Sequence, residues 1–176
     1  MTSRATPVPL AFRFGIFALQ ESDRPDVAAH YLSLDDEARI RRFGIKLSDE
    51  GVAHLIERLP FSPMTWGLFV GGRLKGTCMV LYDKDSRHKG EFAITLSEGM
   101  RKSGWGGLMT KMALDAAYHH GMDEVEINYI AQNTPMARLA SRFPGTLVKE
   151  FGECCKTVEL KNWVEAQLLE DECIYA

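Results

Sequence analysis

The sequence predicts one α/β domain of the α+β type, and three stretches carry this prediction. Residues 91–96 form a short apolar strand that leads into a glycine-rich loop and then a helix. Two further strands are separated by Gly71-Gly72, a two-residue hairpin signal. Residues 124–130 alternate apolar positions after the helix, so this strand crosses back and lies parallel to 91–96. We therefore expect a twisted, mixed and mostly antiparallel sheet that is flanked by helices.

The other elements are predicted from hydrophobic periodicity and from residues that end helices. Ser33 and Asp36 form an expected capping box, Ser48 an expected N-cap, and Gly44 an expected helix stop. The expected strands cover 12–19, 65–70, 73–82, 91–96, 124–130, 146–151 and 154–160, and the expected helices cover 22–34, 35–43, 48–59, 105–120, 133–143 and 161–170.

Length and composition fit one globular domain. The chain has 176 residues, with 45% hydrophobic and 26% charged residues, and a net charge of −3. This charge predicts no affinity for nucleic acid or for an anionic membrane. Residues 10–19 are apolar but too short to span a bilayer, and Arg13 interrupts them. We expect a flexible arm over 1–9 and a single domain over 10–176.

The cysteines predict free thiols and no metal site. Cys154 and Cys155 are adjacent, and no C-x-x-C pair occurs among the four cysteines, so neither zinc nor an ordinary disulfide is favoured. His119-His120 fits a helix end better than a ligand set. Free thiols are typical of a reducing compartment, and a cytoplasmic location is expected.

The loop after residue 96 has the chemistry of a phosphate site. The first N–H groups of a helix have no intrahelical partner, and the helix dipole adds about half a positive charge there. Gly104 and Gly106 remove Cβ atoms, so that a pyrophosphate can approach the backbone. Arg101 and Lys102 add positive charge at the rim.

The glycine order distinguishes between phosphate ligands. No Lys-Ser or Lys-Thr pair follows the glycines, as a P-loop requires, and Met109 stands at the third glycine position of G-x-G-x-x-G. The segment 101–106 instead matches [RQ]-x-x-G-x-G. It resembles the acetyl-CoA pyrophosphate loop of the GNAT superfamily of N-acyltransferases, and this resemblance implies acetyl-CoA as the cosubstrate. A tight strand–helix turn is the alternative.

The resemblance extends over about residues 10–160, because the predicted element order is also the GNAT order. The segment His30–Phe43 further resembles the H-x-L-x-x-D-x-E-x-R-x-x-R-F pattern of one bacterial branch. That branch includes the GNAT domains of protein-lysine acetyltransferases. The arginines of this segment otherwise fit a solvated helix face.

The resemblance also implies which residues hold acetyl-CoA. The family binds the thioester between two splayed parallel strands, which here would be 91–96 and 124–130. Ile94 and Leu96 would contact the pantetheine arm through their backbones, and Asn133 through its side chain. Asn133 is also a preferred helix N-cap, and both roles can hold. The implied cofactor-binding residues are Ile94, Leu96, Arg101, Lys102, Ser103, Gly104, Trp105, Gly106 and Asn133.

Glu91 is the predicted general base. A lysine-like amine has a pKa near 10.4, so roughly 4–5 kcal/mol separates it from its nucleophilic form at pH 7. A positioned carboxylate can remove that proton. Glu91 begins the central predicted strand, and Glu91-Phe92-Ala93 matches the Glu-x-Ala of the branch. The alternative is a solvated strand end.

One departure from the family leaves the general acid open. Many GNATs have a tyrosine seven residues after the asparagine, where it protonates the departing thiolate, and here that position is Ala140. Tyr129 and Ser141 are weak substitutes. Ala140 therefore keeps a second hypothesis open, a non-catalytic CoA-binding regulatory module.

The sequence thus predicts an acetyl-CoA-dependent N-acetyltransferase in which a primary amine attacks the thioester directly. A route through a cysteine is disfavoured, because no cysteine lies in the strand–loop–helix motif. A protein lysine and a small-molecule amine both remain open as acceptors, and a homodimer is left open.

Overall fold

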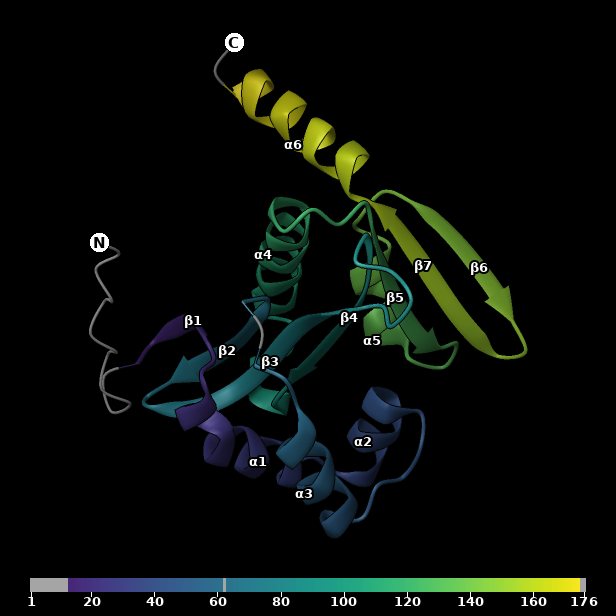
Figure 1. The fold of residues 1–176 in the computed structure, drawn as a ribbon. Helices are drawn as coiled ribbons and strands as arrows, with labels where there is room; N and C mark the ends of the chain where they lie inside the picture. The colour runs from purple at the N-terminus through teal and green to yellow at the C-terminus, as the bar shows by residue number, and fades with distance from the viewer. Residues whose placement is uncertain (1–12, 62, 175–176) are drawn as a thin grey trace.

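A computed structural model of the protein describes residues 13–61 and 63–174, with side chains described to residue 167. The described part of the chain forms a seven-stranded sheet in the order β1-β2-β3-β4-β5-β7-β6 (Figure 1). The strands are β1 (Gly15–Ala18), β2 (Thr65–Val70), β3 (Arg73–Tyr82), β4 (Lys89–Leu96), β5 (Glu124–Ile130), β6 (Thr146–Glu150) and β7 (Glu153–Glu159).

The central pair β4–β5 is the one parallel pair of the described sheet, and every other neighbouring pair is antiparallel. This confirms the predicted mixed sheet. One expectation about β4 is wrong, because the strand begins at Lys89 and Glu91 is its third residue. The reason is that Lys89 and Gly90 pair with Glu124 and Val125, which extends the strand by two residues at its start.

Helices cover both faces of the sheet. The helices are α1 (Arg24–Leu32), α2 (Asp36–Phe43), α3 (Asp49–Arg58), α4 (Trp105–His119), α5 (Thr134–Ala140) and α6 (Leu160–Ile174), with short 3₁₀ turns η2 (Glu21–Asp23) and η3 (Glu98–Met100). In Figure 1, α1 to α3 lie on one side of the sheet and α4 on the other, while α6 extends beyond it.

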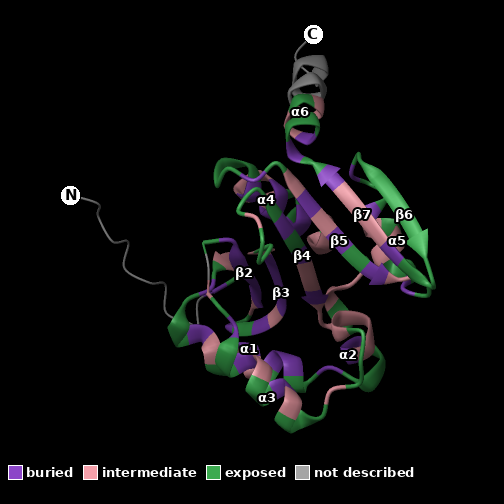
Figure 2. Cartoon of the chain, turned by 45° about the vertical axis from the view of Figure 1, so that its right-hand side comes forward, coloured by how far each residue is buried: buried purple, intermediate pink, exposed green. Residues whose placement is uncertain are grey.

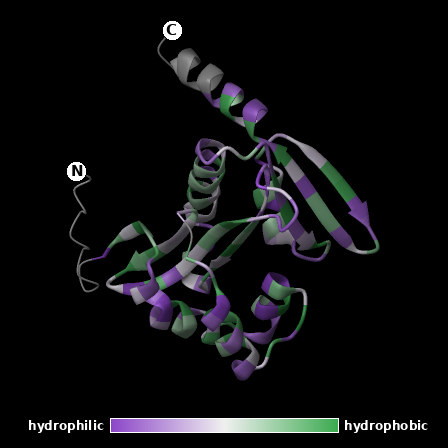
Figure 3. Ribbon diagram, in the orientation of Figure 1, coloured by the Kyte–Doolittle hydropathy of each residue, from purple (hydrophilic) through white to green (hydrophobic). Residues whose placement is uncertain are grey.

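The two faces have separate hydrophobic cores. One core joins α4, α5 and the first turn of α6 to the strands, and the other joins α1, α2 and α3 to β2 and β3. Figure 3 shows hydrophobic central strands and alternating hydrophilic and hydrophobic bands on α1 to α3. This banding is typical of amphipathic helices on a sheet.

The helix ends agree with most of the predicted caps. Gly44 ends α2 in the left-handed region, with φ at 75°, and the Ser48 side chain accepts the Gly51 N–H at the start of α3. The capping box expected at Ser33 is wrong. Ser33 ends α1 and donates to the His30 carbonyl, and Asp35, two residues later, caps α2 instead.

The two ends of the chain differ from the expected bounds in small ways. The expected arm over 1–9 and residue 12 lie outside the described residues, and the strand expected over 12–19 covers only Gly15–Ala18. The last helix begins at Leu160, directly after β7. Figure 2 shows β6 as an exposed edge strand. No helix in the described ranges is both long enough and apolar enough to cross a membrane.

Candidate active site

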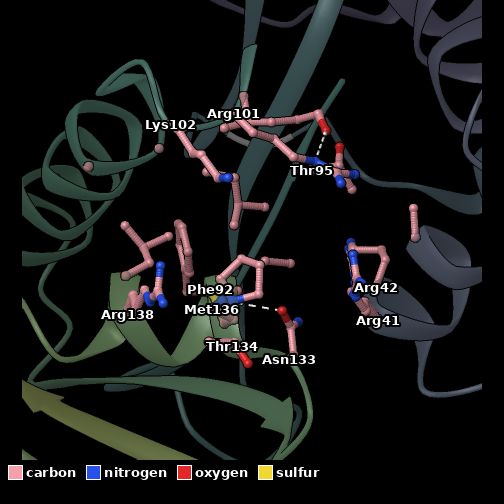
Figure 4. Close-up of a pocket in the computed structure, with 18 of the residues that line it drawn as sticks. Arg41, Arg42, Phe92, Thr95, Arg101, Lys102, Asn133, Thr134, Met136 and Arg138 are labelled. Atoms are coloured by element: carbon pink, nitrogen blue, oxygen red, sulfur yellow. Dashed lines mark hydrogen bonds between the residues drawn. The ribbon is translucent and has the colours of Figure 1, made fainter. Parts of the chain in front are cut away.

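A pocket of about 560 Å³ opens where the parallel strands separate (Figure 4). Pairing between β4 and β5 ends at Phe92 and Ile127, although β4 continues to Leu96 and β5 to Ile130. On their outer sides both strands stay paired, with β3 and β7. The gap is therefore held open by a rigid sheet on either side, and residues of β4, β5, α2, α4 and α5 line the pocket.

Backbone groups of β4 face this gap. Ser97 N–H donates to Lys75 O at 2.8 Å at the end of the β3–β4 ladder. Hydrogen-bonded and non-hydrogen-bonded pairs alternate along an antiparallel ladder, so the odd-numbered residues of β4 bond to β3. Ile94 and Leu96 therefore direct their N–H and C=O groups away from β3, and Arg101 Nε donates to the Leu96 carbonyl at 3.2 Å. The free edge of β4 can receive an extended ligand as if it were a strand.

The glycine-rich loop opens α4 at one end of the pocket. The first bond of the helix joins Leu108 N–H to Gly104 O at 3.1 Å, so the N–H groups of residues 105–107 have no partner within the helix. Lys102 and Gly104 have positive φ values of 60° and 89°. Such a loop at a helix N-terminus turns successive N–H groups toward one point, where an anion can bind.

Four cations surround this end of the pocket. Arg101 and Lys102 belong to the loop, and Arg138 and Arg142 come from α5 and the turn after it. Figure 4 shows Lys102 and Arg138 extending into the same part of the pocket. The sequence interpretation missed Arg138 and Arg142. Their i, i+4 spacing after the predicted cap is the signal that could have identified them.

Asn133 begins α5 as predicted. It is buried in the pocket wall, and its side-chain oxygen accepts the Met136 N–H at 3.2 Å (Figure 4). The capping role is thus confirmed. The NH₂ group of the same side chain makes no hydrogen bond to the described residues, so it can donate into the pocket.

Helix α2 forms the opposite wall. Leu34, Ala38, Arg41 and Arg42 line the pocket from this side, and Figure 4 places the two arginines across the pocket from Arg138. Below them lies the face of β4 that carries Glu91, Ala93 and Thr95. Glu91 is exposed and lines the pocket, one residue before the end of the β4–β5 pairing.

The surroundings of Glu91 are acidic. Its register partner on β5 is Glu126, so the two carboxylates lie side by side on one face of the sheet. Burial raises the pKa of the Cys155 thiol on β7, and the charges of Glu126 and Glu91 raise it further. Cys155 is therefore a neutral thiol at pH 7, and this face of the sheet attracts cations.

A buried polar chain supports the free part of β4 from below. Thr95 Oγ1 lies 2.8 Å from His30 Nε2 and 2.9 Å from Thr77 Oγ1, and Thr77 Oγ1 lies 3.0 Å from the Tyr31 hydroxyl. His30 Nδ1 is buried and has no partner among the described residues. Burial, with a smaller effect of the Lys75 charge, lowers the pKa of His30 to about 4. The imidazole is therefore neutral, and it holds Thr95 where β5 no longer supports the strand.

Some predicted residues lie away from the pocket. Ser103 donates to the Met100 carbonyl at 2.6 Å, and Trp105 packs against the α4-side core, so neither side chain lines the pocket. The two substitutes considered for the general acid lie elsewhere as well. Tyr129 is buried on the α4 side, and Ser141 donates to the Arg138 carbonyl. Ala140 is buried in the core.

The described residues form no cluster of three or more histidine, cysteine or acidic side chains suited to a metal ion. Cys78, Cys154 and Cys155 are free thiols. Burial keeps the pKa of Cys78 far above its usual range, so this thiol is inert.

Comparison with solved structures places this arrangement in a known fold. The GNAT domain of S. lividans PAT is 14% identical, with a TM-score of 0.69, and the match covers 82% of this chain and 89% of that one. For yncA of Salmonella typhimurium, solved with its cofactor acetyl-CoA, the identity is 15%, the TM-score 0.61 and the coverage 82% and 92%. A ribosomal-protein-alanine N-acetyltransferase of Brucella melitensis is 15% identical, with a TM-score of 0.61 and coverage of 81% and 96%.

The sequence comparisons found no match, in contrast to the structure comparison. No protein-family model matches the chain. No curated protein matches it either. The seven-stranded sheet, its single described parallel pair and the likeness to these three structures together show that the chain has the GNAT fold.

Proposed function

We propose that this protein is an N-acetyltransferase that moves an acetyl group from acetyl-CoA to a primary amine by direct attack. The observation that carries the proposal is one continuous pocket, which reaches from the N-terminus of α4 into the gap between β4 and β5. Along its length the pocket has a phosphate site at α4, then the open edge of β4, and then the carboxylate of Glu91. The likeness to yncA, whose structure holds acetyl-CoA, supports the same ligand here.

The residues along the pocket fit the chemical parts of acetyl-CoA. The free N–H groups of residues 105–107 and the four cations of the α4–α5 wall would hold the phosphates. The edge of β4 at Ile94 and Leu96 would bind the amides of the pantetheine arm, and the Asn133 NH₂ group would donate to it. Gly106 lines this part of the pocket, and a Cβ there would lie at ordinary contact distance from Leu96 and Leu139, 3.5 and 3.9 Å.

The bound thioester supplies the acetyl group, and the protein supplies the deprotonated amine. Glu91 lines the pocket beside the gap and is exposed to solvent, so it can accept a proton from an incoming ammonium group, directly or through a water. Glu126 beside it adds negative charge that favours the approach of a cationic amine. An N–H of the free β4 edge would polarise the reacting carbonyl.

A covalent route through cysteine has little support. Cys155 is the cysteine nearest to the acidic face, and its raised pKa keeps it protonated. A thiol is a poor nucleophile compared with a thiolate. The three free thiols also agree with the reducing environment of the cytoplasm, which we propose as the location.

Two classes of amine are candidates for the acceptor. A protein lysine is the first candidate, since the segment His30–Phe43 resembles a branch that includes protein-lysine acetyltransferases, and a small-molecule amine is the second. The open, solvent-facing position of Glu91 accommodates either class. Rates of acetyl transfer to a lysine peptide and to a small primary amine with the same alkyl chain as lysine distinguish the two classes.

The proposal is tested by CoA binding and by turnover. Calorimetry should show CoA binding to the wild-type protein, and transfer of radiolabelled acetyl groups should occur to at least one member of a panel of amines and lysine peptides. CoA binding without turnover on any amine would favour the non-catalytic CoA-binding module. No CoA binding would exclude both functions.

A further inference from the structure

We propose that Arg41 and Arg42 form a subsite for a carboxylate of the acceptor, so that the acceptor is an amine that also carries an anionic group. This inference rests on the proposed function and adds the chemical class of the acceptor. Three observations support it: the hydrogen-bond donors of Arg42 are poorly paired, Arg42 lies on the α2 wall, and the sheet face next to that wall is acidic.

Arg42 is a half-buried cation whose hydrogen-bond donors are poorly matched. Its guanidinium stacks on the Phe43 ring, with 5.1 Å from Cζ to the ring centre, and Nη2 lies 3.9 Å from Met79 Sδ. A thioether is a weak acceptor. The buried Nε has no partner, and no carboxylate of the described residues forms an ion pair with this arginine. Leaving a charged group poorly paired is costly, and an anionic ligand on the part of the guanidinium that lines the pocket would offset that cost.

Arg41 is available for the same ligand. It pairs with Glu37 one turn earlier on α2, and that carboxylate is largely exposed. Exposed i, i+4 ion pairs contribute little to stability, so a ligand can take over the Arg41 guanidinium at little cost. Figure 4 shows Arg41 and Arg42 together on one side of the pocket.

The position of this pair argues against a role in holding the CoA phosphates. The phosphate end already has the free N–H groups of α4 and the four cations of the α4–α5 wall. Arg41 and Arg42 lie on the opposite wall, across the gap between the strands (Figure 4). That wall faces the side of β4 that carries Glu91. A second charged group bound there would belong to the acceptor.

The chemistry of the two sites defines the acceptor. A guanidinium binds a carboxylate through two parallel hydrogen bonds, and apolar surroundings such as Leu34 and Ala38 strengthen the attraction. Glu91 and Glu126 receive the ammonium group. The shared ligand feature is a carboxylate near a primary amine, as in a free amino acid or in a peptide lysine next to an aspartate.

The test compares acceptors that differ in one carboxylate. One pair is an α-amino acid and its decarboxylated amine, and the other is a short peptide with Lys-Asp and its Lys-Asn counterpart. We expect the acidic member of at least one pair to have a kcat/KM about 10- to 100-fold higher. The pair that shows the difference identifies the source of the carboxylate.

The variants assign that preference to the arginines. Arg42→Gln should abolish the preference while the Kd for CoA changes less than about twofold, and Arg41→Gln, which does not disturb the Phe43 stack, should reduce it. Arg58→Gln, at an exposed arginine of α3, is the matched control and should behave as wild type. Equal rates within both pairs, or a preference that survives both variants, would overturn the inference.

A binding measurement keeps this inference separate from the proposed function. With the protein saturated with CoA, calorimetric titration with glutarate probes the anion subsite and needs no turnover. Binding to wild type that is lost in Arg42→Gln would support the subsite even if no amine were acetylated. No glutarate binding to wild type would overturn the subsite and leave CoA binding and acetyl transfer intact.

Discussion

The two walls of the pocket are built in different ways. The phosphate end of the α4–α5 wall is built from a strand end, a loop and a helix start that follow one another in the sequence, with α5 beside them. Its binding groups are mainly backbone N–H groups and cationic side chains. The α2 wall and the sheet face below it combine segments far apart in the sequence. They carry side chains of both signs, Glu91 and Glu126 against Arg41 and Arg42. The α4–α5 wall therefore suits the phosphates of acetyl-CoA, and the α2 wall with the sheet face suits the amine acceptor and would determine which amines are accepted.

The largest effect is expected on the acceptor side. Glu91→Gln keeps the shape of the side chain and removes its basicity, so turnover at pH 7 should fall by roughly 10²–10⁴. Affinity for acetyl-CoA should persist, because Glu91 lies outside the phosphate wall. Part of the rate should return at high pH, where solvent deprotonates the amine. Glu126→Gln, at the neighbouring carboxylate, is the control and should affect the rate less.

The measurement for Glu91 is a pH–rate profile of the three proteins with one accepted amine. Equal rates of wild type and Glu91→Gln at pH 7 would show that Glu91 is only a solvated strand residue. A uniform loss of rate at every pH would also exclude proton removal as its role.

The second effect tests the phosphate wall. Gly104 has φ at 89°, a conformation that a β-branched residue adopts only with strain. Gly104→Val should therefore distort the N–H groups of the loop and weaken CoA binding about 10- to 100-fold. Gly99→Val is the matched control, because a Cβ meets nothing within 4 Å at either glycine and Gly99 lacks the positive φ. Calorimetry measures both, and an unchanged Kd in a folded Gly104→Val protein would contradict the assignment of the loop.

The third effect concerns the support beneath the acceptor side. The pKa of His30 is lowered from 6.5 to about 4 in the folded protein, chiefly by burial. Below pH 6.5, His30 is protonated in the unfolded chain but stays neutral in the folded protein. The free energy of unfolding should therefore fall as the pH drops toward 4. The loss can reach about 3 kcal/mol, at about 1.4 kcal/mol for each pH unit.

This dependence on pH can be assigned to His30 with one variant. His30→Gln can keep a hydrogen-bonding group near Thr95 Oγ1 but does not titrate. Urea unfolding at pH 7 and pH 4.5 should show a much smaller stability loss in His30→Gln than in wild type. An equal loss in both proteins would mean that other groups cause the acid sensitivity.

The contrast between the walls also explains which parts of the site the sequence could predict. The loop, its helix and the Asn133 cap are local patterns, and the structure places them as expected. The sequence predicts Arg42 on a solvated helix face, because nothing local in the sequence shows that β4 and β5 separate beneath α2. The contact of His30 with Thr95 spans 65 residues, so only the fold brings these two side chains together.

Individual errors have the same origin. In α4, the apolar Leu108 is exposed, whereas the polar Thr110 is buried and donates to the Gly106 carbonyl. The sheet, rather than the hydrophobic period, decides which side of this largely apolar helix faces inward. The parallel pairing of β4 with β5 could be predicted from the sequence, since the chain crosses back through α4 between them.

The smallest expected effect lies where the two walls meet. The Asn133 side chain both caps α5 and has an NH₂ group free to donate into the pocket. Asn133→Ala should cost about 1 kcal/mol of stability, because the Met136 N–H loses its acceptor. It should also raise the KM for acetyl-CoA several-fold if the amide binds the pantetheine arm. Asn133→Asp separates the roles, because a carboxylate caps the helix equally well and cannot donate. We therefore expect Asn133→Asp to unfold like wild type in urea and to resemble Asn133→Ala in KM. A wild-type KM in both variants would leave Asn133 with the capping role alone.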